Sequence, residues 1–326
     1  MKTAGVFSAR LLNINKPDDA ERELLRVKVD PTGAAMMAPK MLGRSVHLSG
    51  LSCGQANILK QEMLSLGGDA AVARGTVTCS IDRTDAILIG TDSQLIKLCR
   101  KLGGQPFGLP ALAAEIESLL SNAVAAPKVW KTSRRALPLE RPLIMGILNV
   151  TPDSFYDGKK FQNPQQAVDR ALEMAAQGAD IIDIGGESTR PGAESIDAAE
   201  EMKRVLPVIG RLSGLFTCPI SVDTWKSSVA CEAVKAGAEI INDISGFTFD
   251  PAMAETASNT GVGVVLMHTR GAPADMQSET CYDDLIGEII LGLQRSADVA
   301  VQSGIDRERI AIDPGFGFGK DAKGNL

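Results

Sequence analysis

Carboxylate and amide side chains recur through the C-terminal half of the sequence, each at or just past the end of a short apolar segment. Carboxylate and amide oxygens accept hydrogen bonds, and one carboxylate can bind two neighbouring N–H donors at once. Gathered at one place, such side chains could bind a planar polar ligand. Together with one histidine, the residues concerned are Asn149, Asp183, Asp223, Asn242, Asp243, His268 and Asp313.

The apolar segments before these residues have the composition of buried β-strands, and helical stretches lie between them. Asn163-Pro164 and the spacing of Asp197 and Glu200 are typical of helix starts, and a glycine follows each of four helix ends. Alternating helices and uniformly apolar strands predict a parallel sheet that is buried on both faces. The expected strands are 143–148, 181–184, 219–222, 239–241, 262–267 and 310–312, and the glycines are Gly178, Gly237, Gly261 and Gly304.

The carboxyl ends of parallel strands lie together, and in a (β/α)8 TIM barrel they form the active-site face. An open doubly wound sheet also binds ligands at its strand ends, so the placement of the polar residues favours a barrel only mildly. No G-x-G-x-x-G motif follows the first strand, which counts against a dinucleotide-binding sheet. The predicted fold class is therefore α/β, of the (β/α)8 TIM-barrel type.

Six motifs in this region, in order and with matching spacing, resemble those of dihydropteroate synthases over about residues 141–326. Two of them are longer than ten residues, so the resemblance is specific. By this resemblance the chain would belong to the pathway that makes folate, as a transferase that binds a pterin. The motifs are MGILNVTPDSFYDG (145–158), DIGGESTRPGA (183–193), SVDT (221–224), INDI (241–244), LMH (266–268) and DPGFGFGK (313–320).

The resemblance implies a role for several residues. A pterin carries neighbouring N–H donors that a carboxylate can accept, and Asp223, Asn242 and Asp313 would form the pterin pocket, with Met267 packing on the ring. The Asn149 amide oxygen would help to hold Mg²⁺, which needs few protein ligands. The residues expected in catalysis are Asp157, Asp183, Thr189 and Arg190, and those expected beside para-aminobenzoate or elsewhere in the substrate site are Pro191, Gly317, Phe318 and Lys320.

The reaction implied by the resemblance begins with loss of pyrophosphate from 6-hydroxymethyl-7,8-dihydropterin pyrophosphate. The amine of para-aminobenzoate then attacks the pterin methylene cation and gives 7,8-dihydropteroate. Such a cation needs shelter from water, which two polar loops, 151–158 and 186–195, would provide by closing over the site.

Other interpretations of the same residues stay open. Asp153 and Asp157 could be ordinary turn residues, Asp183 could only cap the loop after its strand, and His268 could be purely structural. A pterin-binding methyltransferase that acts on methyltetrahydrofolate would share the barrel, although the first two motifs argue against it. A non-catalytic pterin-binding or interaction module is the third possibility.

The length of 326 residues suits two domains. Residues 1–125 predict a small α/β domain of unknown role, with strands at 45–48, 70–73, 77–81 and 85–90 and helices at 54–66, 93–102 and 112–120. An Ala-, Pro- and Lys/Arg-rich segment at 126–141 is expected to be a linker, and 142–326 to be the barrel domain.

A complete barrel takes about 250 residues, whereas only six strands are expected here. We therefore expect an incomplete barrel of about six of the eight βα units. The strand-seven lysine and the strand-eight Arg-x-His motif of dihydropteroate synthases would be missing, and the chain alone is expected to have little activity.

The composition narrows the range of partners. The net charge of −6, with no basic run, makes nucleic acid an unexpected partner, and no apolar run reaches the 18 residues of a membrane span. The six cysteines are scattered and form no C-x-x-C pair, which, without a signal peptide, predicts reduced thiols and a cytoplasmic location. Small-molecule substrates are expected, and a homodimer for the full-length protein.

Overall fold

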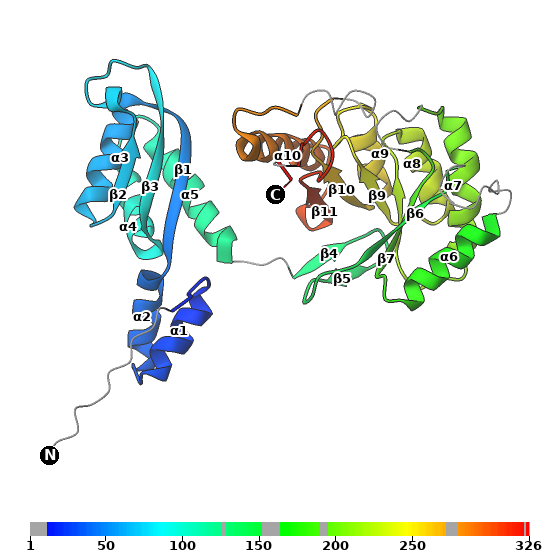
Figure 1. Cartoon of the computed structure of the whole chain (residues 1–326), viewed down its shortest axis with the longest axis horizontal. Helices are drawn as coiled ribbons and strands as arrows, with labels where there is room; N and C mark the ends of the chain where they lie inside the picture. Colours follow the sequence, from blue (N-terminus) through cyan, green and yellow to red (C-terminus); the bar gives the residue numbers. More distant parts are fainter. Residues whose placement is uncertain are drawn as a thin grey trace. The chain divides into compact units, whose positions relative to one another are not determined.

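The computed structural model describes residues 12–124, 128–151, 164–188, 195–271, 280–322 and 324–325. The chain forms two compact units, Met1–Ala126 and Pro127–Leu326, both drawn in Figure 1. Within the described part of the chain, no helix has both the length and the apolar content needed to cross a bilayer.

The second unit is built on a six-stranded parallel sheet whose spatial order follows the chain, from β6 to β11. A doubly wound sheet reverses its strand order at a switch point, whereas consecutive neighbours joined by helices are typical of a barrel wall. The α/β fold of TIM-barrel type is therefore confirmed, with six strands present in the described residues. The strands are β6 (Met145–Asn149), β7 (Ile181–Gly185), β8 (Ile220–Asp223), β9 (Ile240–Asp243), β10 (Gly263–Met267) and β11 (Ile310–Asp313).

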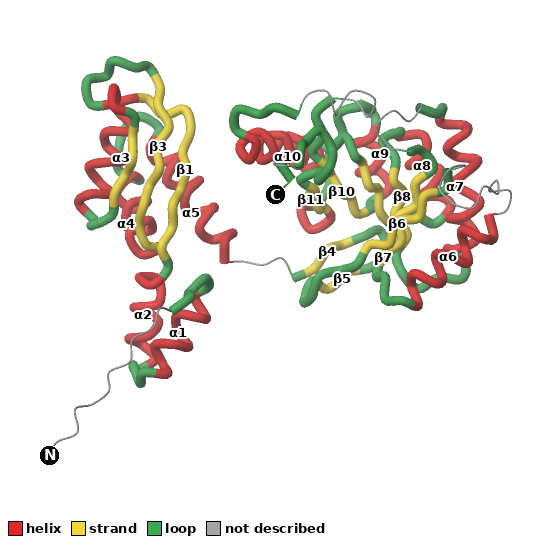
Figure 2. Tube along the Cα trace, viewed as in Figure 1, coloured by secondary structure: helices red, strands yellow, loops and turns green. Residues whose placement is uncertain are grey.

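Helices cover the outer side of this sheet (Figure 2). Residues that alternate with the strand-end polar side chains point outward and bury their apolar surface against the helices, at about 25 cal/mol per Å². Ile184, Val222 and Ile241 in this layer are completely inaccessible to solvent. The helices are α6 (Pro164–Ala176), α7 (Ala198–Ser213), α8 (Ser227–Ala236), α9 (Met253–Thr260) and α10 (Leu285–Gln302), and a 3-10 turn, η2 (Arg307–Arg309), precedes β11.

The expected helix boundaries are largely confirmed. Pro164 is the first residue of α6, and Asp197 caps α7 by accepting a 2.7 Å hydrogen bond from the Glu200 amide. The Glu200 carboxylate pairs with Arg204 at 3.0 Å. Gly237 ends α8 with φ +129°, and a Cβ there would lie 2.3 Å from Ser213, so glycine is required at this position by both the backbone and the space.

The segment 126–141 was expected to be a linker, but part of it is folded. Its residues include a β-hairpin of β4 (Val129–Lys131) and β5 (Ala136–Pro138), which belongs to the second unit. The Trp130 ring packs against Ile181 and Ile240, and its Nε1 donates to the Arg309 carbonyl at 3.0 Å. The residues that Trp130 contacts lie far from it in the sequence, so the local sequence pattern did not predict the hairpin.

The first unit has a three-stranded antiparallel sheet of order β1-β3-β2. One face carries the buried residues of β1 and β3 and packs on helices, with Leu59, Leu88 and Leu95 fully inaccessible. A small α/β unit is thus observed, as expected. Its elements are α1 (Pro17–Arg26), α2 (Pro31–Met41), β1 (Gly43–Ser52), α3 (Cys53–Ser65), β2 (Asp69–Val72), η1 (Arg74–Thr76), β3 (Arg83–Thr91), α4 (Asp92–Leu102) and α5 (Leu109–Val124).

Two features of this unit differ from expectation. Residues 77–81 were expected to form a strand but form a turn, in which the Cys79 amide donates to the Thr76 carbonyl at 3.2 Å and Cys79 has a φ of +49°. A left-handed residue interrupts an extended strand. Helices α1 and α2 were not expected, and they bury only a small apolar cluster of their own.

Candidate functional site

Four neighbouring strand ends bring Asn149, Gly185, Asp223 and Asn242 into register, one residue on each strand from β6 to β9. Residues paired in register on adjacent strands point to the same face of a sheet. A Cβ at Gly185 would lie 3.2 Å from Asn149 Oδ1 and 3.3 Å from Asp223 Oδ2. A side chain at Gly185 would therefore crowd both an amide oxygen and a carboxylate, and glycine avoids this.

A second, deeper polar layer lies beneath this row. Asp183, two residues before Gly185 on β7, is only 4% exposed. The side-chain amide of Asn242 donates to its Oδ2 at 2.9 Å. Burial raises the pKa of Asp183, and this hydrogen bond opposes the rise.

The surroundings of Asp223 disfavour its negative charge, which places this carboxylate under electrostatic stress. It remains partly accessible at the surface but is surrounded by protein on most sides. Burial first, and then the neighbouring carboxylates of Asp183 and Glu201, raise the pKa of Asp223 well above its ordinary 3.8. A ligand that brings N–H donors or positive charge to Asp223 would relieve this stress, which makes the position suited to binding.

Asp243, by contrast, faces its own loop. Its Oδ1 accepts hydrogen bonds from both the amide and the hydroxyl of Ser245 at 2.7 Å, and its Oδ2 accepts one from the Phe247 amide at 3.0 Å. The side chain is completely buried. Asp243 therefore fixes the turn after β9, which is a structural role.

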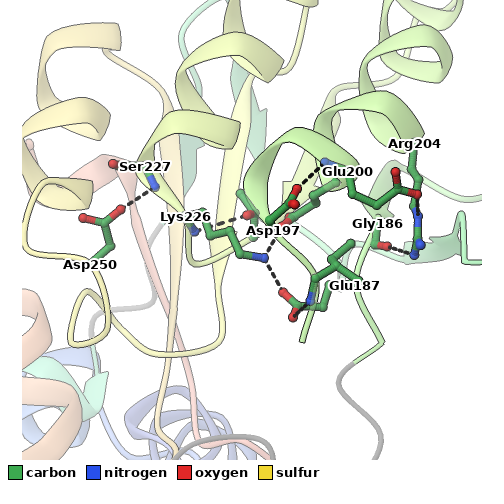
Figure 3. Close-up of polar contacts among 11 residues, drawn as sticks. Gly186, Glu187, Asp197, Glu200, Arg204, Lys226, Ser227 and Asp250 are labelled. Atoms are coloured by element: carbon green, nitrogen blue, oxygen red, sulfur yellow. Dashed lines mark hydrogen bonds and ion pairs between the residues drawn. The ribbon is translucent and has the colours of Figure 1, made fainter. Parts of the chain in front are cut away.

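A buried lysine that the sequence analysis did not single out lies beside this site. Lys226 Nζ is 2.6 Å from Glu187 Oε2, as Figure 3 shows, and 2.5 Å from Glu201 Oε2. Glu201 is 0% exposed and Lys226 is 8% exposed. The available signal was the position of Lys226 two residues after the SVDT motif, where a helix would be expected to begin.

This lysine also connects segments that are far apart in sequence. Glu187 follows β7 and accepts a hydrogen bond from the Ile196 amide at 3.1 Å through its other oxygen. Arg204 of α7 donates to the Gly186 carbonyl at 3.0 Å, also visible in Figure 3. The residues immediately after β7 are thus held to α7 and to the start of α8 by charge-assisted hydrogen bonds.

The glycine-rich segment after β11 is organised by Asp313 and Lys320. Asp313 Oδ1 accepts a hydrogen bond from the Gly315 amide at 2.7 Å. Lys320 Nζ donates to the carbonyls of Gly315 and Phe318, each at 3.0 Å. Since Lys320 is only 4% exposed, its ammonium group holds its own loop together, and its direct contact with a substrate stays a prediction.

His268 lies against the same ammonium group. Its Nδ1 is 3.3 Å from Lys320 Nζ. Burial and the charge of Lys320 both lower the pKa of His268, while burial lowers the pKa of Lys320. A neutral imidazole that accepts a hydrogen bond from Lys320 fits the structural interpretation of this histidine.

The remaining expected site residues divide into two groups. Met267 is buried and pairs in register with Asp313, while Gly317 and the partly buried Phe318 follow on the glycine-rich segment. Met267 lies at the end of β10 and points to the same face as Asn242, because Val265, two residues before it, pairs with Asn242 in register. Four expected residues lie outside the described part of the chain: Asp157, Thr189, Arg190 and Pro191.

No group of three or more His, Cys, Asp or Glu side chains in the described segments could hold a metal ion by itself. The amide oxygen of the exposed Asn149 lies beside Gly185 in the same row as Asp223. Mg²⁺ often takes one or two protein oxygens and completes its shell with water and phosphate. The donor set fits such a loosely held ion.

Comparison with known proteins agrees with this geometry. A "pterin binding enzyme" family model matches residues 145–326. A probable bifunctional folylpolyglutamate synthase/dihydropteroate synthase of Halobacterium salinarum is 44% identical over 314 residues, covering 95% of this chain and 37% of the relative. The dihydropteroate synthase of Bacillus subtilis is 52% identical over 187 residues, covering 57% of this chain and 63% of the relative.

Solved structures give the same picture. The dihydropteroate synthase of Yersinia pestis in a sulfonamide drug complex superposes with a TM-score of 0.57 at 45% identity, covering 60% of this chain and 71% of that one. A Burkholderia cenocepacia dihydropteroate synthase complexed with 7,8-dihydropteroate gives 0.53 at 40% identity, with 60% and 66% coverage. The chain thus spans 37% to 63% of the curated relatives named above. With the family model matched along the whole six-stranded sheet, the chain belongs to the pterin binding enzyme family.

Proposed function

We propose that this chain supplies the pterin-binding part of a dihydropteroate synthase, a transferase of folate biosynthesis. The enzyme would join 6-hydroxymethyl-7,8-dihydropterin pyrophosphate to para-aminobenzoate, giving 7,8-dihydropteroate and pyrophosphate. One observation carries the proposal: Asp223 and Asn242 stand in register at neighbouring strand ends, in the row that also holds Asn149 and Gly185. The names of the relatives from Halobacterium salinarum and Bacillus subtilis support the same activity.

The pterin would be bound by its N–H edge. The Asp223 carboxylate can accept two N–H donors at once. Its raised pKa shows that the protein around it disfavours its negative charge. The N–H donors of a pterin would stabilise that charge in place of a bound proton. Asn242 offers an amide oxygen, since its nitrogen already donates to Asp183. Asp313 would complete the polar contacts, and Met267 would pack against the flat ring.

The reacting groups would lie toward the loops. Asp183 would supply negative charge beneath the pterin methylene cation. We propose roles in catalysis also for Asp157, Thr189 and Arg190, and roles in binding para-aminobenzoate for Pro191, Gly317 and Phe318. Lys320 would act by holding the carbonyls of Gly315 and Phe318 in place.

Mg²⁺ is proposed as the cofactor, with the amide oxygen of Asn149 as its protein ligand. When bound, the ion supplies positive charge to the departing pyrophosphate. The residues around it would do the remaining work: Gly185 places no side chain against Asn149 and Asp223, and Asp223 would orient the pterin. A cytoplasmic homodimer is proposed for the full-length protein; the six free cysteines support the location, and sedimentation analysis would test the dimer.

Calorimetric titration of the 326-residue chain with the pterin pyrophosphate, with and without Mg²⁺, tests this proposal. Asp223→Asn should weaken binding at least tenfold, because a charge-assisted pair is worth roughly 1.5–3 kcal/mol. The matched control is Asp306→Asn, because Asp306 follows α10 in the sequence and its side chain is 79% exposed. Binding of methyltetrahydrofolate in preference to the pterin pyrophosphate would instead support a methyltransferase.

A further inference from the structure

Two of the six cysteines meet in the first unit, outside the candidate site. Cys53 is the first residue of α3 and is 6% exposed, while Cys79 lies in the turn between η1 and β3 and is exposed. Cys79 is close enough to Cys53 to contribute to the raised pKa of its thiol. Both are free thiols.

Independent contacts place both thiols on the same turn. Cys53 Sγ donates to the carbonyl of Ile81 at 2.8 Å, two residues beyond Cys79. Cys79 Sγ lies 3.7 Å from the carbonyl of Thr76, three residues before it. Asn57, one helical turn after Cys53, donates to that same Thr76 carbonyl at 3.0 Å. The start of α3 and the turn at residues 76–81 are therefore in direct contact, and both thiols bond to carbonyls of this turn segment.

The backbone at Cys79 is unusual. Its φ of +49° lies in the left-handed region, which is costly for a residue that is not glycine and often marks a functional position. The turn is also tight, because a Cβ at Gly75 would lie 2.7 Å from Ser80 Oγ. The strained backbone thus holds the accessible thiol of Cys79 in the turn that the buried Cys53 contacts.

We propose that Cys53 and Cys79 are a thiol-oxidation site that closes to a disulfide on reaction with a hydroperoxide. The exposed Cys79 thiolate attacks one peroxide oxygen; the O–O bond breaks, and the other oxygen leaves and is protonated to water or an alcohol. Cys79 is then a sulfenic acid. The Cys53 sulfur attacks the Cys79 sulfur, the S–O bond breaks, and the hydroxyl group leaves with the Cys53 proton as water. Two thiols lose two electrons, and the peroxide gains them.

The buried partner is suited to the second step and not to the first. Burial, and then contact with Cys79, raise the pKa of the Cys53 thiol, and its 6% exposure keeps peroxide away from it, so Cys79 reacts first. Thiolate character and access decide which cysteine is oxidised first. A small reactant reaches Cys79, and the resulting sulfenic acid forms beside Cys53.

The test is to treat the full chain with hydrogen peroxide and to compare peptide maps made without and with dithiothreitol. The expected result is a peptide cross-linked between Cys53 and Cys79, a mass loss of two hydrogens, and two fewer free thiols than the six of the reduced chain. Dithiothreitol should restore all of them. A Cys79 that is oxidised to the sulfinic acid while Cys53 stays reduced would overturn the proposal.

Variants separate this pair from general oxidation. Cys79→Ser should abolish the cross-link and leave Cys53 reduced, whereas Cys281→Ser, a change at an exposed cysteine of the second unit, should leave the cross-link intact. Cys53→Ser should trap Cys79 as a sulfenic acid that dimedone labels. A cross-link from Cys53 to any other cysteine in the Cys79→Ser chain would also contradict the assignment.

Discussion

Asn242 on β9 donates a hydrogen bond to Asp183 on β7 at 2.9 Å, across the intervening strand β8. In register, Asn242 belongs to the row of Gly185 and Asp223, whereas Asp183 lies one layer deeper. The bond therefore joins the ligand-facing row to the buried layer beneath it. A substitution at either end should affect both layers.

Asn242→Ala should destabilise the second unit by about 1–3 kcal/mol, because a buried carboxylate loses a donor. It should also weaken pterin binding, since one side chain contributes to both layers. Urea unfolding and calorimetric titration would measure the two effects. Asn259→Ala is the matched control at an exposed position of α9, and an equal loss of stability there would contradict the prediction.

The raised pKa of Asp223 predicts how stability depends on pH. The folded state holds this proton more tightly than the unfolded state, so stability should fall as pH rises from the ordinary value of 3.8 through the raised one. Asp223→Asn should therefore raise the melting temperature at pH 7 and flatten its fall as the pH rises above 3.8. Asp183 and Asp243, whose pKa values are also raised, should leave a residual slope.

This prediction is tested by thermal melts without ligand at a series of pH values above 3.8. If Asp223→Asn lowered the melting temperature at pH 7, Asp223 would be a net stabilising charge, contrary to its surroundings. Loss of pterin binding in the same variant would show that the carboxylate is retained for binding at a cost in stability.

Lys226 should be essential to folding of the second unit. Lys226→Met leaves Glu187 and Glu201 near one another without their shared cation, and breaking a buried pair typically costs about 3–5 kcal/mol. Lys203→Met removes a lysine whose side chain is 75% exposed and should change stability by less than about 1 kcal/mol. Comparable denaturation midpoints for the two variants would refute a structural role for the buried ion pairs.

A double variant identifies the reason for that loss. Lys226→Met combined with Glu201→Gln removes the cation and neutralises the completely buried carboxylate. The double variant should unfold at a higher urea concentration than Lys226→Met alone, because burying an uncharged amide costs less free energy than burying an unpaired carboxylate. If it did not, the loss would come from packing of the lysine stem.

Sequence patterns were most informative where local and long-range requirements agree. The six strands were predicted because each is apolar throughout and has a polar residue at or near its end, as at Asn149 and Asp223. The meeting of these residues follows from parallel topology alone. The C′ glycines at Gly237 and Gly261 were predictable because positive φ is a local property of the chain.

Features held by distant partners were not predictable. Trp130 is ordered by Ile181, Ile240 and the Arg309 carbonyl, none of which affects the sequence near 130. The sequence around Lys226 does not indicate that folding buries this lysine beside Glu201, which lies 25 residues earlier. The turn at Cys79 was mistaken for a strand because its apolar neighbours alternate with polar residues while its backbone does not stay extended.

The glycine-rich segment after β11 permits a paired test at Gly315 and Gly317. Both have positive φ, +71° and +80°, so alanine should cost about 1–2 kcal/mol at either position from backbone strain. Only Gly315 also lacks space, because a Cβ there would lie 2.1 Å from the His268 carbonyl oxygen, whereas a Cβ at Gly317 would meet nothing within 4 Å. Gly315→Ala should therefore cost about 1–3 kcal/mol more than Gly317→Ala.

Lys320 contacts the same two carbonyls that lie close together at Gly315. Its ammonium group donates to the Gly315 carbonyl, and to the His268 carbonyl at 3.4 Å. Pushing these carbonyls apart in Gly315→Ala should release the ammonium group and raise the pKa of His268 toward its ordinary value, because both burial and Lys320 lower it. Titration of the His268 ring protons by NMR would measure this. An unchanged His268 pKa in Gly315→Ala, with the shift appearing in Gly317→Ala, would show that backbone strain and not the close approach organises the loop.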